Sequence, residues 1–250
     1  MKAIMLAAGI GSRLAPSDEN LLPKCLLKFE GKSLLSRHIQ TLKSVGIEEL
    51  TIVMGYQADK IESELKKIDR TGFVTTIINP DYLNGSIFSL YCARNTMQSG
   101  RDILFMDADV LYHPELIIRL ISSKNDNHIL YDCNYVPGDD PVLLCINNGK
   151  ITDFRKRANA PCENIGEWPG FVKWSPTAAR QISKIIDQWV SQGHVSLPCE
   201  SAFREYMLNT KKKNIYCDDI TGIPWIEIDF PEDLKRAQNF VLKAINSYTR

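Results

Sequence analysis

The sequence has few features of a membrane-bound, secreted or nucleic-acid-binding protein. Its 250 residues carry no net charge, with 30 Lys and Arg against 30 Asp and Glu, and the longest basic run is the three lysines at 211–213. A broad nucleic-acid-binding surface is therefore not expected. No apolar run approaches the ~20 residues of a membrane-spanning helix, and the opening AIMLAAGIG lacks the cleavage pattern of a signal peptide. We expect a cytoplasmic protein without a membrane partner.

Metal-binding and disulfide patterns are also missing. The seven cysteines are an odd number without a C-x-x-C pair, and the four histidines show no ligand spacing. Reduced thiols in a cytoplasm fit this distribution best. No G-x-S-x-G elbow indicates a Ser/His/Asp hydrolase. His38 lies on the apolar stripe of a predicted helix, where we expect a packing role.

Apolar spacing in the first 110 residues predicts strands that alternate with helices. The predicted strands cover 2–6, 49–55, 74–78 and 103–106, and the predicted helices cover 34–45, 58–68 and 86–97. Such alternation is typical of βαβ units, in which the strands lie parallel and helices cover the sheet. We expect a three-layer α/β fold.

Beyond Asp109 this alternation becomes less regular. Two apolar runs joined by Asn147, Asn148 and Gly149 predict a β-hairpin over 142–154. The other predicted elements are a helix after Pro114, strands at 129–132, 170–175, 214–219 and 225–230, and helices at 177–190, 200–208 and 231–245. We expect one α/β/α domain of Rossmann-like type, whose mixed, mainly parallel sheet carries a small antiparallel lobe.

A loop of small residues follows the first predicted strand, at the end where open α/β sheets bind ligands. Its backbone N–H groups can approach phosphate oxygens, and Arg13 and Lys24 add a bidentate fork and a point charge. The loop fits neither the dinucleotide-binding fingerprint, since position 14 is Leu, nor a P-loop. Gly9 and Gly11 alone would indicate only a tight strand exit, but the two basic residues favour a triphosphate site.

Two acidic pairs lie at predicted strand ends. Asp107 and Asp109 are two residues apart, as are Glu227 and Asp229, so in an extended chain both members of a pair point to the same side. Carboxylate oxygens arranged in this way suit Mg²⁺, which prefers hard oxygen ligands. The alternative is that Asp109 and Asp229 cap the helices that follow them.

LAAGIGSRL, followed by PKCLLKFEGKSLL, resembles the start of the nucleotidyltransferases that build NDP-sugars and CDP-alcohols, with the pattern L-A-A-G-x-G-[ST]-R-[LM] and then P-K. FMDADV and WIEIDFPEDLKRA resemble the acidic strand end and the C-terminal segment of the same family. The resemblance implies a Mg²⁺-dependent reaction in which an acceptor oxygen displaces pyrophosphate from the α-phosphorus of a nucleotide. Positioning and charge neutralisation are then the protein's main tasks.

The same resemblance implies roles for single residues. Lys24 would neutralise the α-phosphate and Arg13 would hold the leaving β- and γ-phosphates. Residues 15–22 are interpreted as a mobile flap from their position between these two basic residues, not from the resemblance. The implied metal ligands are first Asp107 and Asp229, and then Asp109 and Glu227.

The segment NPDYLNGSIFSL resembles the phosphocholine and phosphonate cytidylyltransferase branch in its N-x-S-I-x-S-L. Its amide and hydroxyl groups suit the Watson–Crick edge of a pyrimidine, although Asn84 with Gly85 would also form a turn and Ser86 a helix N-cap. The chain has no hexose-1-phosphate pattern and no hexapeptide repeats, which favours CTP. The predicted nucleotide-binding residues are Leu6, Ala7, Ala8, Gly9, Gly11, Ser12, Arg13, Lys24, Asn79, Asn84, Ser86 and Ser89.

Later segments resemble the acceptor-binding part of this branch more loosely. Lys156 is predicted to meet the acceptor phosphate, with Arg155 or Arg157 as alternatives. Aromatic and acidic residues nearby suit an ammonium head, although such aromatics also pack in cores. We expect 2-aminoethylphosphonate or phosphocholine as the acceptor, with the choice between a primary and a quaternary amine left open. The acceptor candidates are Tyr131, Asp132, Lys156, Glu167, Trp168, Glu200 and Trp225.

We therefore expect a Mg²⁺-dependent cytidylyltransferase in a single domain over 1–250. About 1–110 would bind the nucleotide, about 128–220 the acceptor, and 225–250 would supply a metal-binding strand and the C-terminal helix. A sugar- or polyol-1-phosphate nucleotidyltransferase is the alternative enzyme, and a non-catalytic nucleotide-binding regulatory module is the alternative of another class. A homodimer is left open.

Overall fold

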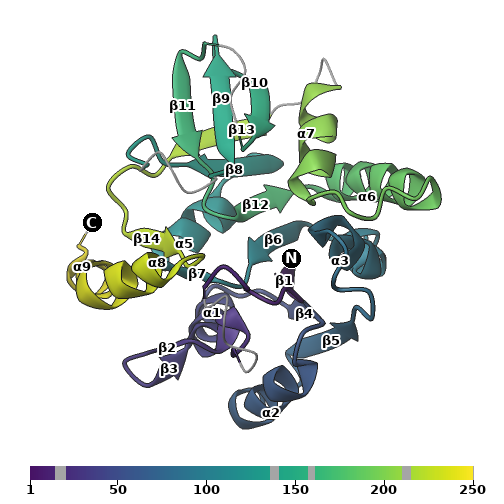
Figure 1. Ribbon diagram of the computed structural model, residues 1–250. Coiled ribbons are helices and arrows are strands. Elements are labelled where there is room, and N and C mark those ends of the chain that lie inside the picture. Colours follow the sequence, from purple (N-terminus) through teal and green to yellow (C-terminus); the bar gives the residue numbers. More distant parts are fainter. Residues whose placement is uncertain (15–20, 136–140, 157–160, 210–214, 250) are drawn as a thin grey trace.

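A seven-stranded sheet forms the centre of the computed structural model, which describes residues 1–14, 21–135, 141–156, 161–209 and 215–249 (Figure 1). Its strand order is β13-β8-β12-β6-β1-β4-β5. β12 runs antiparallel to both of its neighbours, and the other pairs are parallel. The strands are β1 (Lys2–Ala7), β4 (Glu49–Met54), β5 (Val74–Ile78), β6 (Ile103–Asp107), β8 (Asn127–Tyr131), β12 (Phe171–Trp174) and β13 (Ile215–Asp219). The predicted mixed, mainly parallel sheet is confirmed.

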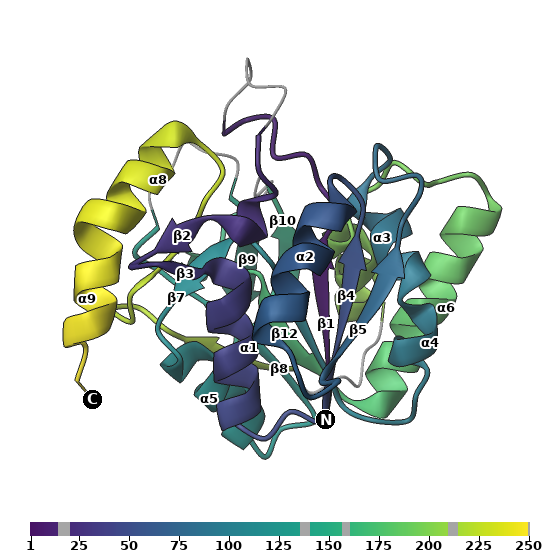
Figure 2. The same cartoon turned by 90° about the horizontal axis from the view of Figure 1, so that it is seen from below.

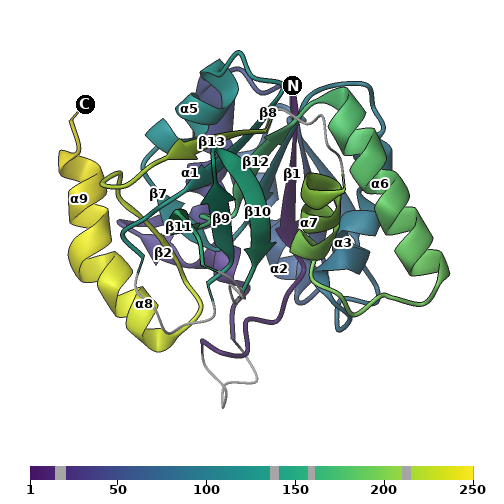
Figure 3. The same cartoon turned by 90° about the horizontal axis from the view of Figure 1, so that it is seen from above.

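Helices cover both faces of this sheet, because alternate residues of a strand point to opposite sides. In β1, Ala3 and Met5 pack in one apolar cluster and Ile4 in another. The first cluster includes side chains of α1 (Leu34–Ser44), α2 (Ala58–Ile68) and α5 (Glu115–Ser122). The second includes side chains of α3 (Ser86–Cys92), α4 (Arg94–Met97), α6 (Pro176–Ser191) and α7 (Glu200–Leu208). Figures 2 and 3 show these layers from opposite sides and confirm the three-layer fold.

Helix starts follow signals in the sequence. The hydroxyls of Ser33 and Ser175 each accept the backbone N–H three residues later, at the first turns of α1 and α6. The helix predicted over 86–97 divides at Ala93, which separates α3 from α4. Within the described residues, no helix combines the length and the apolar character that crossing a membrane requires.

Small antiparallel sheets and the C-terminal helices complete the fold. The hairpin predicted over 142–154 forms β9 and β10, which β11 joins in a three-stranded sheet. The strand predicted over 225–230 ends at Glu227, because its partner β7 pairs with only three residues. These elements are β2 (Lys28–Phe29), β3 (Lys32–Ser33), β7 (Val110–Tyr112), β9 (Leu143–Asn147), β10 (Lys150–Arg155), β11 (Asn164–Glu167), β14 (Trp225–Glu227), α8 (Pro231–Arg236), a π-helical turn (Ala237–Val241) and α9 (Leu242–Ser247).

Two cysteines depart from the expectation of reduced thiols. Cys145 in β9 and Cys162, which precedes β11, form a disulfide. The antiparallel pairing of β9 with β11 brings them together, since Cys145 faces Ile165 in that register. The expectation is therefore wrong for this pair. The free cysteines are Cys25, Cys92, Cys133, Cys199 and Cys217.

His38 has the packing role that its position in the sequence predicts. Its ring is fully buried and stacks on Tyr112 at 5.3 Å between centroids. Nε2 lies 3.2 Å from the carbonyl oxygen of Ala108, and Nδ1 lies 3.3 Å from the Tyr112 hydroxyl. Burial lowers the pKa of His38 to about 4, so the ring is neutral at ordinary pH.

Candidate active site

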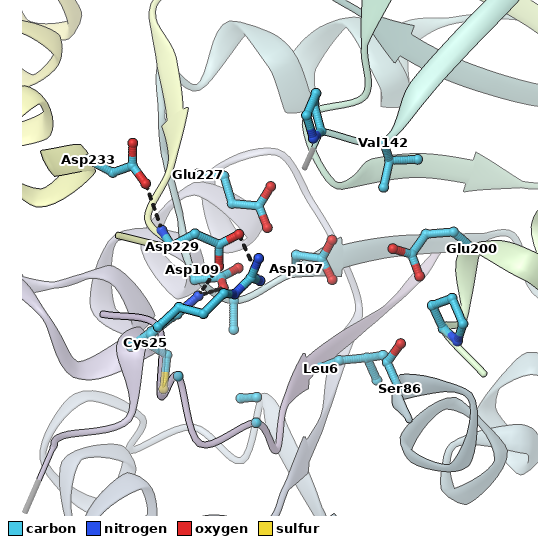
Figure 4. A pocket seen from close by; sticks show the side chains of 18 of the residues that line it. Leu6, Cys25, Ser86, Asp107, Asp109, Val142, Glu200, Glu227, Asp229 and Asp233 are labelled. Atoms are coloured by element: carbon cyan, nitrogen blue, oxygen red, sulfur yellow. Dashed lines mark hydrogen bonds and ion pairs between the residues drawn. The ribbon is translucent and has the colours of Figure 1, made fainter. Parts of the chain in front are cut away.

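A pocket of about 480 Å³ opens beyond the carboxyl ends of β1 and β6 (Figure 4). The loop after β1, the start of α3, the end of β6, the small lobe and the segment after β14 all contribute to its wall. Parallel strands end together at this edge of the sheet, so residues distant in sequence meet there. The predicted site residues that line it are Leu6, Ala7, Ala8, Gly9, Gly11, Ser12, Arg13, Lys24, Asn84, Ser86, Ser89, Asp107, Asp109, Asp132, Lys156, Glu167, Glu200, Trp225, Glu227 and Asp229.

The two basic residues of the first loop form ion pairs with acids from two other segments. Lys24 Nζ lies 2.9 Å from Asp109 Oδ2 and also contacts Asp229 Oδ1. A guanidinium nitrogen of Arg13 lies 2.9 Å from Asp229 Oδ2. Burial opposes the charge of Lys24, but the two carboxylates outweigh it, so the pKa of Lys24 lies above its usual value. We call these four residues the ion-pair array.

Local backbone geometry brings Lys24 into the array. Lys24 starts a short 3₁₀ turn (Lys24–Leu26) directly after Pro23. Gly11 has a φ of +72°, and a Cβ placed there would lie only 3.0 Å from Cγ of Lys24. The glycine therefore provides both the left-handed turn and the space that the lysine side chain fills. Residues 15–20 of the predicted flap lie outside the described residues.

Pairing of β7 with β14 assembles the acidic part of the pocket. Glu227 faces Val110 in this register, and the Ile228 N–H donates to the carbonyl oxygen of Asp109 at 3.1 Å. Carboxylate oxygens of Asp109, Glu227 and Asp229 all lie within 4.8 Å of one another. Burial raises the pKa of Glu227 well above its usual value, and the neighbouring acids add to that effect. The three clustered carboxyl groups supply the hard oxygen ligands that a divalent cation prefers.

Asp107, at the end of β6, lines the same pocket. Among the described residues, the group whose carboxylate oxygens lie within 4.8 Å of one another does not include it. Burial raises the pKa of Asp107 well above its usual range, with nearby carboxylates adding to the shift. Gly170, which precedes β12, approaches this side chain closely, because a Cβ there would lie 2.8 Å from Asp107 Oδ2. No pattern in the sequence indicates this close approach of Gly170 to Asp107.

Asn79 is predicted to bind the nucleotide, but it is not among the described residues that line the pocket. It is fully buried, its amide donates to Ser89 Oγ at 2.9 Å, and its Oδ1 accepts the Asp81 N–H at 2.9 Å. It therefore supports Ser89 from behind. Ser86 lines the pocket, and its hydroxyl accepts the Cys199 N–H at 2.8 Å. The N-cap of α3 is Gly85, so the alternative of Ser86 as N-cap is wrong.

Two aromatic acceptor candidates lie away from the described pocket wall. Trp168 is only 3% exposed and packs edge-on against Phe154 and Phe203. Its indole N–H donates to the carbonyl oxygen of Phe171 at 2.8 Å. It belongs to the core beneath the small lobe. Tyr131 ends β8 and is likewise not among the lining residues.

The remaining acceptor candidates among the described residues, apart from Arg155, line the pocket. Trp225 donates its indole N–H to Asp132 Oδ2 at 2.8 Å, which orients both side chains. Glu200, the first residue of α7, points toward the cavity in Figure 4. Arg155 contacts Asp153 and is not among the lining residues, whereas Lys156 is. Arg157 lies outside the described residues.

Comparison with known proteins decides the family. Residues 3–150 match the MobA-like NTP transferase domain. The chain belongs to this nucleotidyltransferase family. It is 29% identical to the CTP:phosphoglutamine cytidylyltransferase of Campylobacter jejuni, over 94% of this chain and 98% of that one. It is 27% identical to the choline-phosphate cytidylyltransferase of Streptococcus pneumoniae, over 96% and 98%.

A solved structure of the CTP:phosphocholine cytidylyltransferase from Streptococcus pneumoniae shares the fold. Its TM-score is 0.73 at 23% identity, and the match covers 95% of this chain and 97% of that one. The predicted resemblance to the cytidylyltransferase branch and the assignment to the nucleotidyltransferases are thereby confirmed. The roles of single site residues stay predictions.

Several residues that line the pocket are not among the site residues predicted from the sequence. From the sequence alone, Asp233 is expected to be an acid in the first turn of the helix predicted over 231–245, yet it lines the pocket. The EDL run that contains it was the sole signal. The other lining residues of this kind are Pro23, Cys25, Tyr82, Ala108, Asn134, Tyr135, Pro141, Val142, Pro198, Cys199, Ile226 and Arg236.

Proposed function

We propose that the chain is a Mg²⁺-dependent cytidylyltransferase that transfers CMP from CTP to a small, amine-bearing phosphate or phosphonate and releases pyrophosphate. The observation that supports this most is the meeting of Arg13 and Lys24 in one pocket with Asp109, which follows β6, and Asp229, which follows β14. A lone phosphate-binding loop would bind a nucleotide without this acidic partner. The coverage of both named cytidylyltransferases along nearly their whole length supports the same reaction class.

The reaction needs little covalent chemistry from the protein. An acceptor oxygen forms a bond to the α-phosphorus as the bond to the bridging β-phosphate oxygen breaks, and pyrophosphate leaves with that electron pair. Lys24 would offset charge at the α-phosphate, and Arg13 would hold the departing phosphates. Asp109, Glu227 and Asp229, with Asp107 beside them, would hold Mg²⁺, which when bound offsets negative charge on the phosphate oxygens.

The charge of the acceptor side points to a zwitterionic substrate. Lys156 is a cation that suits the phosphate or phosphonate, whereas Glu167 and Glu200, which line the same pocket, are acids that suit an ammonium group. Trp225 adds one aromatic face. Both named relatives act, by their names, on phosphorylated compounds that contain nitrogen.

Pyrophosphate release tests the proposal directly. Each of the four common NTPs would be combined with phosphocholine, phosphoethanolamine, 2-aminoethylphosphonate, inositol 1-phosphate and glucose 1-phosphate, with Mg²⁺ or with excess EDTA. We expect release with CTP and an amine-bearing acceptor, and none with EDTA. Preference for UTP or dTTP with a sugar phosphate would refute the cytidylyl assignment. Absence of pyrophosphate release with every pair would refute the proposed activity.

A further inference from the structure

We propose that Asp233 is a positioning residue of this site, whose carboxylate fixes the backbone turn that presents Asp229. The inference rests on the proposed function for its kinetic part, because Asp229 belongs to the predicted metal-binding and phosphate-binding machinery. Asp233 itself touches the backbone behind Asp229 and would act through it.

The hydrogen bonds of Asp233 converge on two consecutive peptide groups. Its Oδ2 accepts the N–H of Asp229 at 3.1 Å and the N–H of Phe230 at 2.9 Å. The side chain is only 8% exposed, and Figure 4 shows its carboxylate beside Asp229 with the hydrogen bond drawn. Charge-assisted bonds of this kind are stronger than neutral ones, so one buried oxygen holds the whole turn after β14.

This contact extends beyond ordinary helix capping. Phe230 is the N-cap of α8, and a bond from its N–H to the third helical residue belongs to a capping box. The second bond reaches one residue further back, to Asp229, whose own carboxylate pairs with Lys24 and Arg13. A helix cap alone does not require that bond.

The same turn also supports Arg13. The guanidinium carbon of Arg13 lies 5.4 Å from the centroid of the Phe230 ring, within cation–π range. Asp233 thus fixes the backbone of Phe230, which carries this ring, and the backbone of Asp229, which carries the paired acid. Loss of its acceptor oxygen would leave two N–H groups without that partner and release both side chains together.

The chain offers a matched control for this test. Glu232 is the neighbouring acid in the first turn of the same helix, and it is exposed. Asp233→Leu keeps the size of the side chain and removes the acceptor, whereas Asp233→Asn keeps one acceptor oxygen. Asp233→Ala is a second acceptor-free variant in case Leu at this position prevents folding. Glu232→Gln changes charge next to the site without touching the turn.

The experiment combines kinetics with two measurements that need no turnover. In Asp233→Leu or Asp233→Ala we expect kcat for pyrophosphate release to fall about 100-fold, since a shift of ~1 Å at a reacting group has effects of that order. We expect Mn²⁺ affinity, measured by electron paramagnetic resonance with CTP present, to fall at least about 10-fold. Hydrogen exchange of the Asp229 and Phe230 amides should accelerate. Asp233→Asn should restore most of each value, and Glu232→Gln should match the parent.

The outcomes separate the two proposals. If the acceptor-free variants lose only thermal stability, and the folded fraction keeps its kcat, Mn²⁺ affinity and amide protection at Asp229, then Asp233 is a helix cap and the inference is wrong. If the parent protein itself releases no pyrophosphate with any substrate pair, the proposed function is wrong. The Mn²⁺ and exchange measurements then still decide whether Asp233 positions Asp229.

Discussion

At the scale of single residues, the direction of each side chain decides which polar groups reach the pocket. Arg13 and Lys24 line the pocket because they belong to a loop that must follow a parallel strand. Asn79 carries equally suitable groups, yet it turns inward to Ser89. Trp168 lies between two strands, where no alternating pattern tells which way a side chain points, and it fills the core.

Lys24→Met tests the basic side of the pocket. The variant removes the charge that faces Asp109 and Asp229, and with it the cation predicted to face the α-phosphate. We expect kcat to fall about 10²- to 10³-fold, the range found when one such stabilising group is removed. Lys28→Met is the control, since Lys28 is exposed on β2. Near-normal turnover in a folded Lys24→Met protein would exclude the predicted role.

Gly170→Ala tests whether the position of Asp107 matters for turnover. Gly170 has a φ of +84° and borders Asp107, whereas Gly222 has a φ of +91° with no atom within 4 Å of a Cβ built there. Alanine should cost about 1–2 kcal/mol of stability at Gly222, because its conformation is left-handed. The cost at Gly170 should be at least as large, because its Cβ would also displace Asp107. Only Gly170→Ala should lower kcat, by about 10-fold or more. Equal kinetics in the two variants would mean that Asp107 tolerates displacement.

At the scale of elements, the pairing of two short strands brings together acidic residues whose meeting the sequence does not predict. The acidic pairs were identifiable from their spacing, but their meeting depends on β7 and β14, each only three residues long. Strands of that length leave almost no periodic signal. The longer elements were predictable because their apolar faces repeat over several turns or strand residues. The hairpin of β9 and β10 was predictable for a different reason, its Asn-Asn-Gly turn.

The disulfide between Cys145 and Cys162 allows a test of the small lobe. Lys156 lies in the segment that this bond closes, whose two cysteines are 17 positions apart in the sequence. Breaking the disulfide increases the conformational entropy of the unfolded chain, which should lower the free energy of unfolding by about 3 kcal/mol. We expect Cys162→Ser to lower the melting temperature and to raise KM for the acceptor more than KM for CTP. Cys133→Ser, at an exposed free thiol, is the control. Intact mass that shows seven free thiols after non-reducing alkylation would contradict the bond.

At the scale of the whole molecule, the sheet joins segments that sequence reasoning assigned to separate tasks. β8, β12 and β13 come from the second half of the chain, yet they continue the sheet of β6 and β1. The apolar cluster on one face extends from Ile4 to Met207. The alternation in the first half therefore predicted the fold class, while the insertion of antiparallel β12 between β6 and β8 required long-range pairing that local patterns do not encode. The division into nucleotide and acceptor parts stays a prediction.

Global stability should depend on pH through His38. Burial holds the pKa of the folded ring at about 4, against 6.5 as the ordinary value. Between these values the unfolded chain binds a proton that the folded chain does not, so stability falls as the pH falls. Linkage gives a loss of about 2 kcal/mol at pH 5 relative to neutral pH. Urea unfolding at pH 7 and pH 5 should show a smaller loss for His38→Gln than for the parent. An identical loss in both proteins would assign the pH dependence to other groups.

The ion-pair array of Arg13, Lys24, Asp109 and Asp229 has a thermodynamic consequence. Two cations face two anions, so the array is nearly neutral as a whole, and a ligand must separate its pairs before it can use either sign. Under the proposed function, a nucleotide that drew the basic residues away would leave the acids ready for a metal ion, and a metal ion would do the reverse. Binding of the two would then be cooperative and reciprocal, each tightening the other by the same factor. A simple anion without its cation would have to break the pairs unaided, which favours the metal–nucleotide complex over free phosphate.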